Sequence, residues 1–470
     1  MIRPRLRLVS LLACLTLLAP ALAQADPADD LYDAMQGGHC EPALTALRAR
    51  ADAHEASAQH SMAFAAERGV CMPADATVAA GWFRKAAASY RTAAEKGDAE
   101  AQANLGALLA EGQGVDKDVK AAVAWFRKAA EQGRADAQAA LAWAYHTGEG
   151  LDKDESQAVA WYRKAAAQGN VDAQFNLGLM LLHGQGVAAD EQQAMLWLGH
   201  AAEQGEAAAQ VTLGLVYRRH GDDASLVNAL WWFRQAATAG DADGEYELGW
   251  LFEQGQGIAK DEAQAAVLYG KAAARGHALA QNELGAMYAK GRGVPRDDAR
   301  AIALYRQAAA QGMPRAQFNL GWAIEHGQGV SQDDREAAVW YRKAADQGFS
   351  PAQNNLGQQY RWGRGVAQDY RVAVDWLRKA AEQGDAQAQD NLGGMYQHGR
   401  GVEHDEEQAV AWFRKSAERG DATGQSDLAA MYEQGLGVAK DERAAADWYR
   451  KAAAQGDEHA KERLKDIAPE

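Results

Sequence analysis

Apolar and polar positions in this chain follow a pattern that returns at a nearly constant interval. Short apolar blocks recur along most of the chain and end at regularly placed glycines: Gly97, Gly133, Gly169, Gly205, Gly240, Gly276, Gly312, Gly348, Gly384, Gly420 and Gly456. Each interval is 36 residues, except for 35 residues between Gly205 and Gly240. A fixed period of this length is typical of stacked supersecondary units. The pattern predicts ten consecutive repeats over residues 98–456.

Each repeat is predicted to contain two helices, a first and a second. In the first helix four apolar side chains share one face at 100° per residue: Ala101, Leu105, Leu108 and Leu109. A glycine pair such as Gly112 and Gly114 separates the helices. Four residues after the second glycine stands an aspartate that we expect to cap the second helix: Asp118, Asp154, Asp190, Asp261, Asp297, Asp333, Asp369, Asp405 and Asp441. The fold class is therefore all-α, built from helix-turn-helix units.

The second helices carry a large apolar residue at one recurring position: Trp125, Trp161, Trp197, Trp232, Leu268, Leu304, Trp340, Trp376, Trp412 and Trp448. We interpret this column as core that packs between successive helix pairs. The basic residues that follow, such as Arg127 and Lys128, are predicted to form a solvated face with weak salt bridges.

These blocks resemble the Sel-1-like repeat, a branch of the tetratricopeptide superfamily. The likeness lies in Ala-Gln-x-Asn-Leu-Gly at 101–106, Gly-x-Gly-Val-x-x-Asp at 112–118, and Trp-Tyr-Arg-Lys-Ala-Ala at 161–166. It extends over roughly three quarters of the chain. The resemblance implies a right-handed α/α superhelix whose first helices line the concave surface. It also implies protein binding, often in envelope or signalling complexes.

The two ends of the chain depart from the repeat. Residues 24–97 are predicted to be an irregular N-terminal region with repeat fragments, and residues 457–470 a capping helix that carries Leu464 and Ile467. In the fourth repeat His220 replaces the first loop glycine and one residue is missing. That change indicates either a local change of pitch or a contact loop.

The first 23 residues have the features of a signal peptide. A basic start is followed by the apolar segment 8–18 and by an Ala-x-Ala motif that ends at Ala23. We expect cleavage after Ala23 and a periplasmic or secreted protein, with lipid attachment at Cys14 as the alternative. Cleavage would take the formal net charge from −15 to −18. Such an acidic chain is not expected to bind nucleic acid or anionic lipid.

Two cysteines remain in the mature chain, Cys40 and Cys71. Both stand in segments rich in glycine or proline that stacking of helix pairs would bring together. In an oxidising compartment an even pair indicates a disulfide.

Motifs for catalysis are missing from the sequence. It has no Gly-x-Ser-x-Gly, Ser-x-x-Lys, His-Glu-x-x-His or Walker motif. The histidines lack metal-ligand spacing, so neither a metal nor a cofactor is expected. A β-lactamase-like hydrolase is kept as an alternative because some cysteine-rich relatives of the repeat carry that assignment, although this chain lacks their paired cysteines.

Two further columns of the first helix face away from the predicted core, at positions equivalent to 103 and 107. They are apolar in the middle repeats and polar or small in the last three. We predict that a stripe of nine side chains forms an exposed partner-binding surface: Trp143, Phe175, Leu179, Val211, Leu215, Tyr246, Trp250, Phe318 and Trp322. Packing against neighbouring repeats is the alternative for this stripe. The predicted function is an exported scaffold for a protein or peptide, with binding of envelope polysaccharide as a second possibility.

Overall fold

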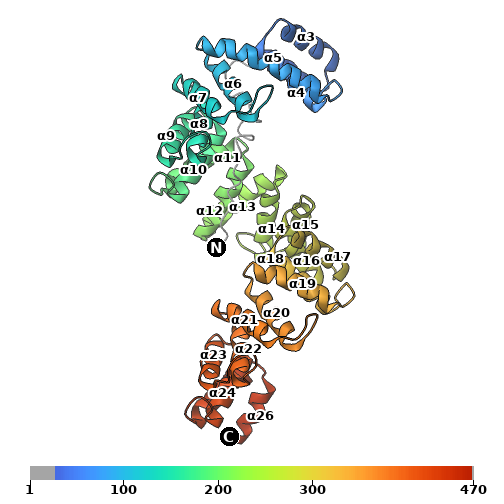
Figure 1. Cartoon of the computed structure of the whole chain (residues 1–470), viewed down its shortest axis with the longest axis vertical. Helices are drawn as coiled ribbons and strands as arrows, with labels where there is room; N and C mark the ends of the chain where they lie inside the picture. Colours follow the sequence, from blue (N-terminus) through green and yellow to red (C-terminus); the bar gives the residue numbers. More distant parts are fainter. Residues whose placement is uncertain (1–26, 468–470) are drawn as a thin grey trace. The chain divides into compact units, whose positions relative to one another are not determined.

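The computed structural model describes residues 27–467, and within them the chain forms helices without strands (Figure 1). The helices are α2 (Pro27–Gln36), α3 (Cys40–Asp52), α4 (Ala56–Arg68), α5 (Ala76–Glu95), α6 (Ala99–Glu111), α7 (Val119–Glu131), α8 (Ala135–Thr147), α9 (Glu155–Ala167), α10 (Val171–His183), α11 (Glu191–Glu203), α12 (Ala207–His220), α13 (Asp223–Thr238), α14 (Ala242–Gln254), α15 (Glu262–Ala274), α16 (Ala278–Lys290), α17 (Asp298–Ala310), α18 (Pro314–Glu325), α19 (Asp334–Asp346), α20 (Ser350–Trp362), α21 (Tyr370–Glu382), α22 (Ala386–Gln397), α23 (Glu406–Glu418), α24 (Ala422–Gln434), α25 (Glu442–Ala454) and α26 (Glu458–Ile467).

The chain divides into two units, the N-terminal unit Met1–Gln235 and the C-terminal unit Ala236–Glu470. Each unit is an array of helix pairs. In the N-terminal unit α6 packs on α7 and α7 on α8, and in the C-terminal unit α20 packs on α21 and α21 on α22. This arrangement confirms the all-α solenoid of helix-turn-helix repeats.

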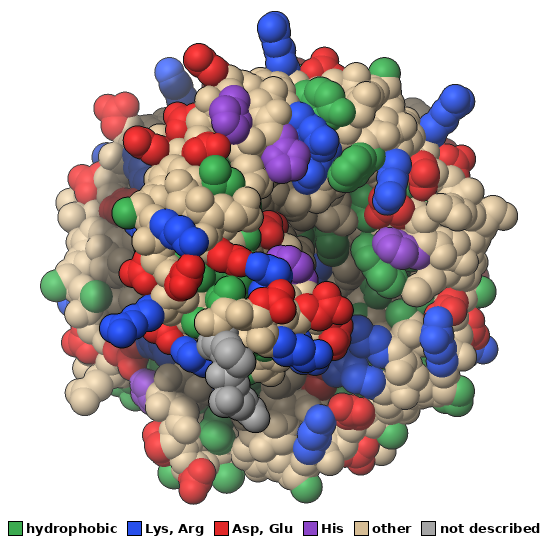
Figure 2. Space-filling view, turned by 90° about the horizontal axis from the view of Figure 1, so that it is seen from below, with side chains coloured by type: hydrophobic (Ala, Val, Ile, Leu, Met, Phe, Trp, Pro, Cys, Tyr) green, Lys and Arg blue, Asp and Glu red, His purple; other side chains and the backbone are tan. Residues whose placement is uncertain are grey.

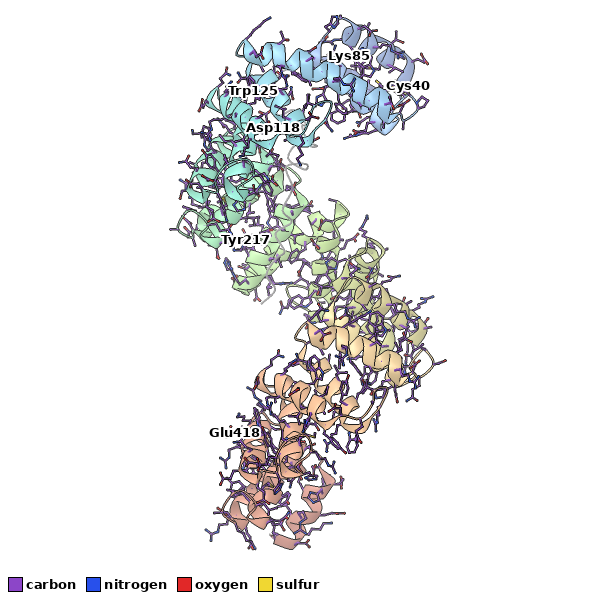
Figure 3. All side chains as sticks on the ribbon, in the orientation of Figure 1. Cys40, Lys85, Asp118, Trp125, Tyr217 and Glu418 are labelled. Atoms are coloured by element: carbon purple, nitrogen blue, oxygen red, sulfur yellow. A yellow bond between two sulfur atoms is a disulfide. The ribbon has the colours of Figure 1, made fainter. Side chains whose placement is uncertain are left out.

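The predicted aspartate caps are present. Asp118 Oδ1 accepts the Ala121 backbone N–H at 2.9 Å, and Asp118 immediately precedes α7 while Trp125 lies on it (Figure 3). The equivalent bond begins eight further second helices, capped by Asp154, Asp190, Asp261, Asp297, Asp333, Asp369, Asp405 and Asp441. The bond satisfies a backbone N–H that the helix itself leaves without a partner.

The two glycines between the helices of a repeat have different structural roles. The first glycine ends a first helix in the left-handed conformation, as Gly112 does after α6 with φ 76°. The second glycine also has positive φ, and in addition it lies against the preceding repeat. A β-carbon at Gly365 would collide with the Asp334 carbonyl oxygen at the start of α19. Only glycine therefore fits this contact between repeats.

A buried glutamine joins most repeats to the previous one. Gln102 Nε2 donates to the Ala94 carbonyl oxygen at 3.1 Å, and Gln132 Nε2 donates to Gln102 Oε1 at 2.8 Å. The same glutamine pair recurs as Gln138–Gln168, Gln174–Gln204, Gln281–Gln311, Gln317–Gln347, Gln353–Gln383 and Gln425–Gln455. The Ala-Gln of the repeat is thus a polar element of the buried junction, satisfied by two hydrogen bonds.

One junction replaces this amide pair by charges. Glu245 stands where the buried glutamine is expected and Arg275 where its partner is expected. Arg275 Nε lies 3.3 Å from Glu245 Oε2, and the Glu245 side chain is almost completely buried. The contact is kept, but it now depends on two opposite charges.

The tryptophan column is only partly core. The deepest large side chains lie one residue later, as Phe126, Tyr162, Tyr341 and Phe413 show. Trp125 packs against the buried cluster while remaining half-buried, and the Lys128 ammonium lies 3.9 Å from the centre of its ring. Lysines cover Trp82, Trp161, Trp340, Trp376, Trp412 and Trp448 in the same way. The basic face is therefore more than a solvated surface, because its lysines shield these rings from water.

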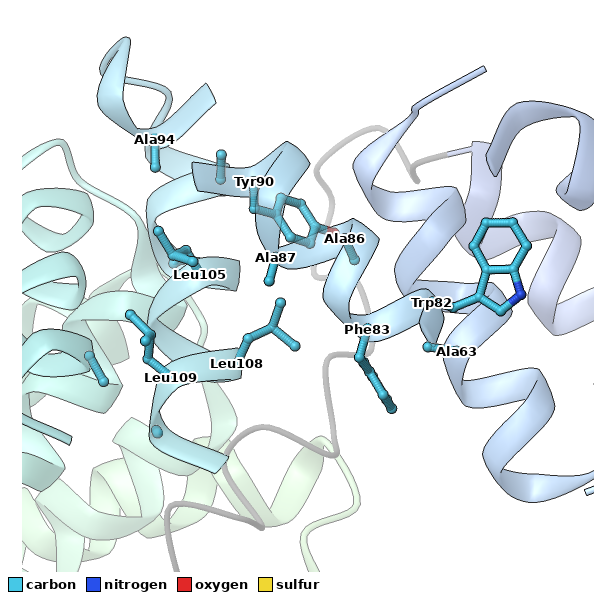
Figure 4. Packing of buried hydrophobic residues seen from close by; sticks show 14 of the residues in the cluster. Ala63, Trp82, Phe83, Ala86, Ala87, Tyr90, Ala94, Leu105, Leu108 and Leu109 are labelled. Atoms are coloured by element: carbon cyan, nitrogen blue, oxygen red, sulfur yellow. The ribbon is translucent and has the colours of Figure 1, made fainter. Parts of the chain in front are cut away.

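The N-terminal region is more regular than predicted. Helices α4 and α5 form a complete pair, and Phe83, Ala87 and Tyr90 of α5 share a buried cluster with Leu105 and Leu108 of α6 (Figure 4). The extra residues before Gly97 lengthen α5 to 20 residues instead of breaking the repeat.

The expected disulfide is present. Cys40, the first residue of α3 (Figure 3), is bonded to Cys71 in the loop after α4, 31 residues later in the sequence. The bond ties the start of α3 to the loop between α4 and α5, the first complete pair.

The C-terminal helix α26 packs on α25, with Ala460 buried and Leu464 and Ile467 partly buried. Among residues 27–467 no helix is both long and apolar enough to cross a membrane. The predicted signal peptide and Cys14 lie outside the described residues.

Candidate functional site

The predicted stripe does not form an exposed patch. Five of its side chains are buried: Trp143, Phe175, Leu179, Val211 and Tyr246. Leu215, Trp250 and Phe318 are half-buried, and Trp322 alone among the nine is exposed, at 39% of its surface. The expectation of a contiguous exposed apolar surface was wrong. The partner-binding role of the stripe stays a prediction, which now rests mainly on Trp322.

The physical reason is that a first helix has neighbours on more than one side. Phe175 and Leu179 of α10 share a buried cluster with Leu198 of α11 and Leu213 of α12. The face that turns away from the helix's own partner is therefore covered by the next repeat. In the C-terminal unit the Tyr246 ring lies 4.8 Å from the His277 ring at the start of α16.

Two positions of the same columns, 282 and 354, carry asparagine, and each accepts a hydrogen bond from the next first helix; we call these contacts the amide ladder. Asn319 Nδ2 of α18 donates to Asn282 Oδ1 of α16 at 2.9 Å. Asn391 Nδ2 of α22 donates to Asn354 Oδ1 of α20 at 2.9 Å. The two donors stand one position after the column. At these two places first helices of the C-terminal unit are thus joined by hydrogen bonds, whereas α10 and α12 of the N-terminal unit meet through apolar side chains.

A pair of carboxyl groups continues this ladder. Asp390 of α22 and Asp427 of α24 are hydrogen-bonded to each other, and burial raises the pKa of both. Asp421 raises both pKa values further, whereas Arg361 lowers that of Asp390 and His459 that of Asp427. Two adjacent carboxyl groups in this environment hold a proton between them at neutral pH.

A serine near this pair lacks the arrangement of a nucleophile. Ser426 Oγ lies 3.1 Å from His459 Nδ1 and donates to Asp457 Oδ1 at 3.3 Å. In a catalytic triad the carboxylate orients the histidine, but here the aspartate contacts the serine. Ser426 is also buried. Among the described residues no group of three or more histidine, cysteine, aspartate or glutamate side chains is arranged to hold a metal ion.

Exposed apolar side chains that the sequence analysis missed lie on the second helices of both units. Leu196, Trp231, Val267 and Val339 occupy the same position of α11, α13, α15 and α19, and all four are exposed. On α13 the exposed apolar area is largest, because Val227 stands one turn before Trp231, and the two are 57% and 50% exposed. The signal was present one position before the tryptophan column, where other repeats carry alanine or aspartate.

On the face shown in Figure 2, acidic and basic side chains are interspersed and hydrophobic ones are scattered among them.

Comparison with known proteins agrees with the repeat pattern. The family model described as Sel1 repeat matches eleven segments: residues 56–89, 99–133, 135–170, 171–206, 207–241, 242–277, 278–313, 314–349, 350–385, 386–421 and 422–457. Ten of these segments cover the range predicted to hold ten repeats, and the first segment adds one repeat in the region predicted to be irregular.

Solved structures of similar proteins support this result. The protein c5321 is described as a protective antigen, with an SLR fold, present in uropathogenic Escherichia coli strains. The two chains are 35% identical, each is covered to 90%, and the TM-score is 0.71. A Sel1 repeat protein from Oxalobacter formigenes is 30% identical over 52% of this chain and 96% of its own, with a TM-score of 0.49.

None of the curated proteins compared with the chain matches it. Proteins built from Sel1 repeats generally mediate protein–protein interactions and are generally non-catalytic. With repeat matches over most of its length, this chain belongs to the Sel1-repeat family.

Proposed function

We propose that this protein is an exported, non-catalytic scaffold that binds a protein partner through the outer face of α13. The observation that carries the proposal is the exposed pair Val227 and Trp231. Large apolar side chains adjacent on a helix are normally buried, since burial of each contributes roughly 1.5–3 kcal/mol. Exposed apolar patches with a tryptophan are typical of interaction sites.

The surface extends along the N-terminal unit. Leu196 of α11 occupies the position equivalent to Trp231 one repeat earlier, and it is exposed as well. A partner helix with an apolar face is the kind of ligand that such side chains suit. The acidic net charge makes a protein partner a better match than nucleic acid.

Export is proposed on three grounds. Residues 1–23 have the pattern of a cleaved signal peptide. The Cys40–Cys71 disulfide suits an oxidising compartment. The E. coli protein c5321 is described as a protective antigen, a description that fits a protein located outside the cytoplasm. We place the mature protein in the periplasm or the medium, with a role in envelope assembly or signalling.

The test is a capture experiment with mature protein and the envelope fraction of the producing cells. Partners are quantified by mass spectrometry for the wild type, for Trp231→Ala and for Val227→Ala. Val78→Ala is the control, because Val78 is also an exposed apolar residue on a second helix but lies on α5, away from the α13 surface. We expect partner recovery to fall at least tenfold in the two α13 variants and to stay unchanged in the control.

Two outcomes would count against the proposal. If recovered proteins are the same for all variants, the α13 surface is not the binding site. If purified mature protein hydrolyses a β-lactam and a single substitution abolishes the turnover, the protein is an enzyme.

A further inference from the structure

Six first helices carry a tyrosine at one recurring position: Tyr145, Tyr217, Tyr288, Tyr360, Tyr396 and Tyr432. In four of them an arginine on the second helix of the preceding repeat, 18 residues earlier, donates to the tyrosine hydroxyl. Arg127 of α7 donates to the Tyr145 hydroxyl of α8 at 3.0 Å, and Arg414 makes the same bond to Tyr432. The other two pairs are Arg342–Tyr360 and Arg378–Tyr396. A guanidinium is thus the regular partner of this tyrosine.

A glycine replaces this arginine before the remaining two tyrosines. Gly270 stands 18 residues before Tyr288, and there Arg300 of α17 donates to the Tyr288 hydroxyl instead, at 3.2 Å. The Arg300 guanidinium lies 5.5 Å from the centre of the tyrosine ring, close to the 5.8 Å that separates Arg127 from the Tyr145 ring. The chain therefore supplies a guanidinium to Tyr288 from another helix.

Tyr217 of α12 (Figure 3) is the exception. Gly199 of α11 stands 18 residues before it, and Asn228 occupies the position equivalent to Arg300. The Tyr217 ring packs against the buried cluster that contains Leu198, while its hydroxyl oxygen is accessible to solvent. Among residues 27–467 this hydroxyl has no hydrogen-bond partner. One tyrosine of the column thus presents an open acceptor at the surface.

The packing of α11 does not require glycine at position 199. The residue lies inside the helix, Glu191–Glu203, and a β-carbon there would meet no atom within 4 Å. Glycine in the interior of a helix lowers its stability relative to alanine. Gly199 therefore leaves open the space that the Arg127 side chain fills in α7.

The sequence around this open space is acidic. Residues 165–217 contain no lysine or arginine but five carboxylates: Asp172, Asp190, Glu191, Glu203 and Glu206. Glu191 is already paired with Arg219 and His220 at the end of α12. The carboxylate that concerns the open space is Glu203, which stands one turn after Gly199 on the same helix.

Glu203 is exposed and makes no ion pair within the described part of the chain. A cation that enters beside Gly199 therefore finds a carboxylate and a hydroxyl oxygen as acceptors. Arg218, the residue after Tyr217, lies 5.9 Å from the centre of the Phe233 ring. A cationic neighbour of this kind does not prevent the contact, because Arg361 follows Tyr360 in the same way and Tyr360 still binds Arg342.

We propose that Gly199, Glu203 and Tyr217 form a binding site for an arginine side chain of the protein partner. The guanidinium donates to the Tyr217 hydroxyl and to the Glu203 carboxylate, in the place that Arg127 occupies beside Tyr145. A planar guanidinium with five N–H donors contacts a hydroxyl and a ring together, which the compact ammonium of lysine does less well. Leu196 lies one turn before Gly199, so the site adjoins the apolar surface of the proposed function and its partner assignment rests on that function.

Fluorine NMR of the mature protein labelled with fluorotyrosine tests the site itself. The signal that is missing from Tyr217→Phe identifies Tyr217. N-acetyl-arginine amide at millimolar concentration should shift this signal, and N-acetyl-lysine amide should bind at least about fivefold more weakly. Gly199→Arg should abolish the shift, because its own side chain occupies the site, whereas Gly199→Ala should retain it. Both substitutions should raise the melting temperature, so that a lost shift is not a loss of folding.

The capture experiment with the envelope fraction tests the partner. Gly199→Arg should lower recovery at least about tenfold, and Gly199→Ala should leave it unchanged. Unchanged recovery with Gly199→Arg overturns the inference, and if Trp231→Ala abolishes capture at the same time, the proposed α13 surface still stands. Loss of capture in Gly199→Arg but not in Trp231→Ala would support the arginine site and contradict the α13 surface. The inference is also wrong if N-acetyl-arginine amide leaves the Tyr217 signal unmoved, shifts it equally in Gly199→Arg, or binds no better than the lysine amide.

Discussion

Two first helices, α10 of the N-terminal unit and α20 of the C-terminal unit, contact their neighbours with different chemistry. In the N-terminal unit Phe175 and Leu179 are buried among leucine and alanine side chains of α11 and α12. In the C-terminal unit the corresponding columns carry Asn354 and Gln358, which reach their neighbours through hydrogen bonds. An apolar contact needs only shape, whereas an amide contact also has direction. The amide ladder can therefore leave a carbonyl oxygen without a hydrogen bond at its end, as it does at Gln358. Apolar contacts leave no polar group without a partner.

The largest expected difference between the two regions concerns one column. Leu179→Ala should cost about 3 kcal/mol of unfolding free energy, because it removes a buried side chain and leaves a cavity. Gln358→Ala, at the equivalent position of α20, should cost no more than about 1 kcal/mol. Urea unfolding followed by circular dichroism measures both. Equal losses of unfolding free energy would mean that the apolar contacts of α10 and the amide contacts of α20 stabilise the protein equally, contrary to this comparison.

A second test uses the charged junction of Glu245 and Arg275. Arg275→Ala leaves a buried carboxylate without its counter-charge, and we expect a loss of roughly 2–4 kcal/mol. The matched control is the double variant Glu245→Gln with Arg275→Gln, which restores the glutamine pair of the other junctions. The double variant should be at least as stable as the wild type in thermal unfolding. A double variant as unstable as Arg275→Ala would show that the ion pair has a role the amides do not replace.

Much of the regular structure could be predicted from the sequence, because it depends on local rules. Asp118 caps a helix through its own backbone neighbours, and Gly112 ends one through its own φ angle. The pairing of Cys40 with Cys71 followed from there being two cysteines in the mature chain. These features need no knowledge of which helices are neighbours in space.

The stripe was misjudged because its burial is not a local property. A helical wheel of α10 places Phe175 away from the face of α10 that packs on α11. The wheel does not show that α12, in the next repeat, covers Phe175. Gln359 of α20, a buried glutamine at a position that is apolar in the other repeats, was missed for a different reason. Its contrast with Leu108 and Met395 is visible only when the repeats are aligned position by position. The sequence contained this contrast, but the hydrogen bonds of the surrounding amides required the structure.

A third prediction concerns the pH dependence of the unfolding free energy that the carboxyl pair Asp390 and Asp427 causes. Burial raises the pKa of both Asp390 and Asp427 in the folded state, and the Asp427 carboxyl raises that of Asp390 further. A raised pKa means that the folded protein binds the proton more tightly, so this contribution to stability is present below about pH 4 and is lost as pH rises. In Asp390→Asn the side chain is neutral at every pH, so no buried charge forms at this position. The unfolding free energy should therefore rise by about 1 kcal/mol at pH 8.

The pH series has a built-in control. At pH 5 the gain from Asp390→Asn should be smaller than at pH 8, because less of the proton-dependent penalty has developed. Melting temperatures of wild type and variant between pH 5 and 9 give the comparison. A gain that does not change over this range would show that the two carboxyl groups do not share a proton.

The smallest effect is expected at the exposed end of the stripe. The Trp322 ring is stacked on the His326 ring at 4.3 Å, but 39% of its surface is open to solvent. Trp322→Ala should therefore change stability by less than about 1 kcal/mol. Trp143→Ala, a buried member of the same stripe, should cost about 3 kcal/mol or more. If Trp322→Ala is as costly as Trp143→Ala, no member of the stripe is free to bind a partner.

The repeated junction has a consequence for how such a gene changes over time. Because Gln102 meets Gln132 in the same way that Gln353 meets Gln383, residues 36 positions apart have interchangeable surroundings. Recombination that deletes or duplicates the DNA for one full repeat joins each helix to an equivalent neighbour wherever the junction is a glutamine pair. The length of the protein can therefore change in steps of one repeat without a new kind of contact. The charged junction of Glu245 and Arg275 is different, because it exists in a single copy and is kept only when both residues are deleted or duplicated together.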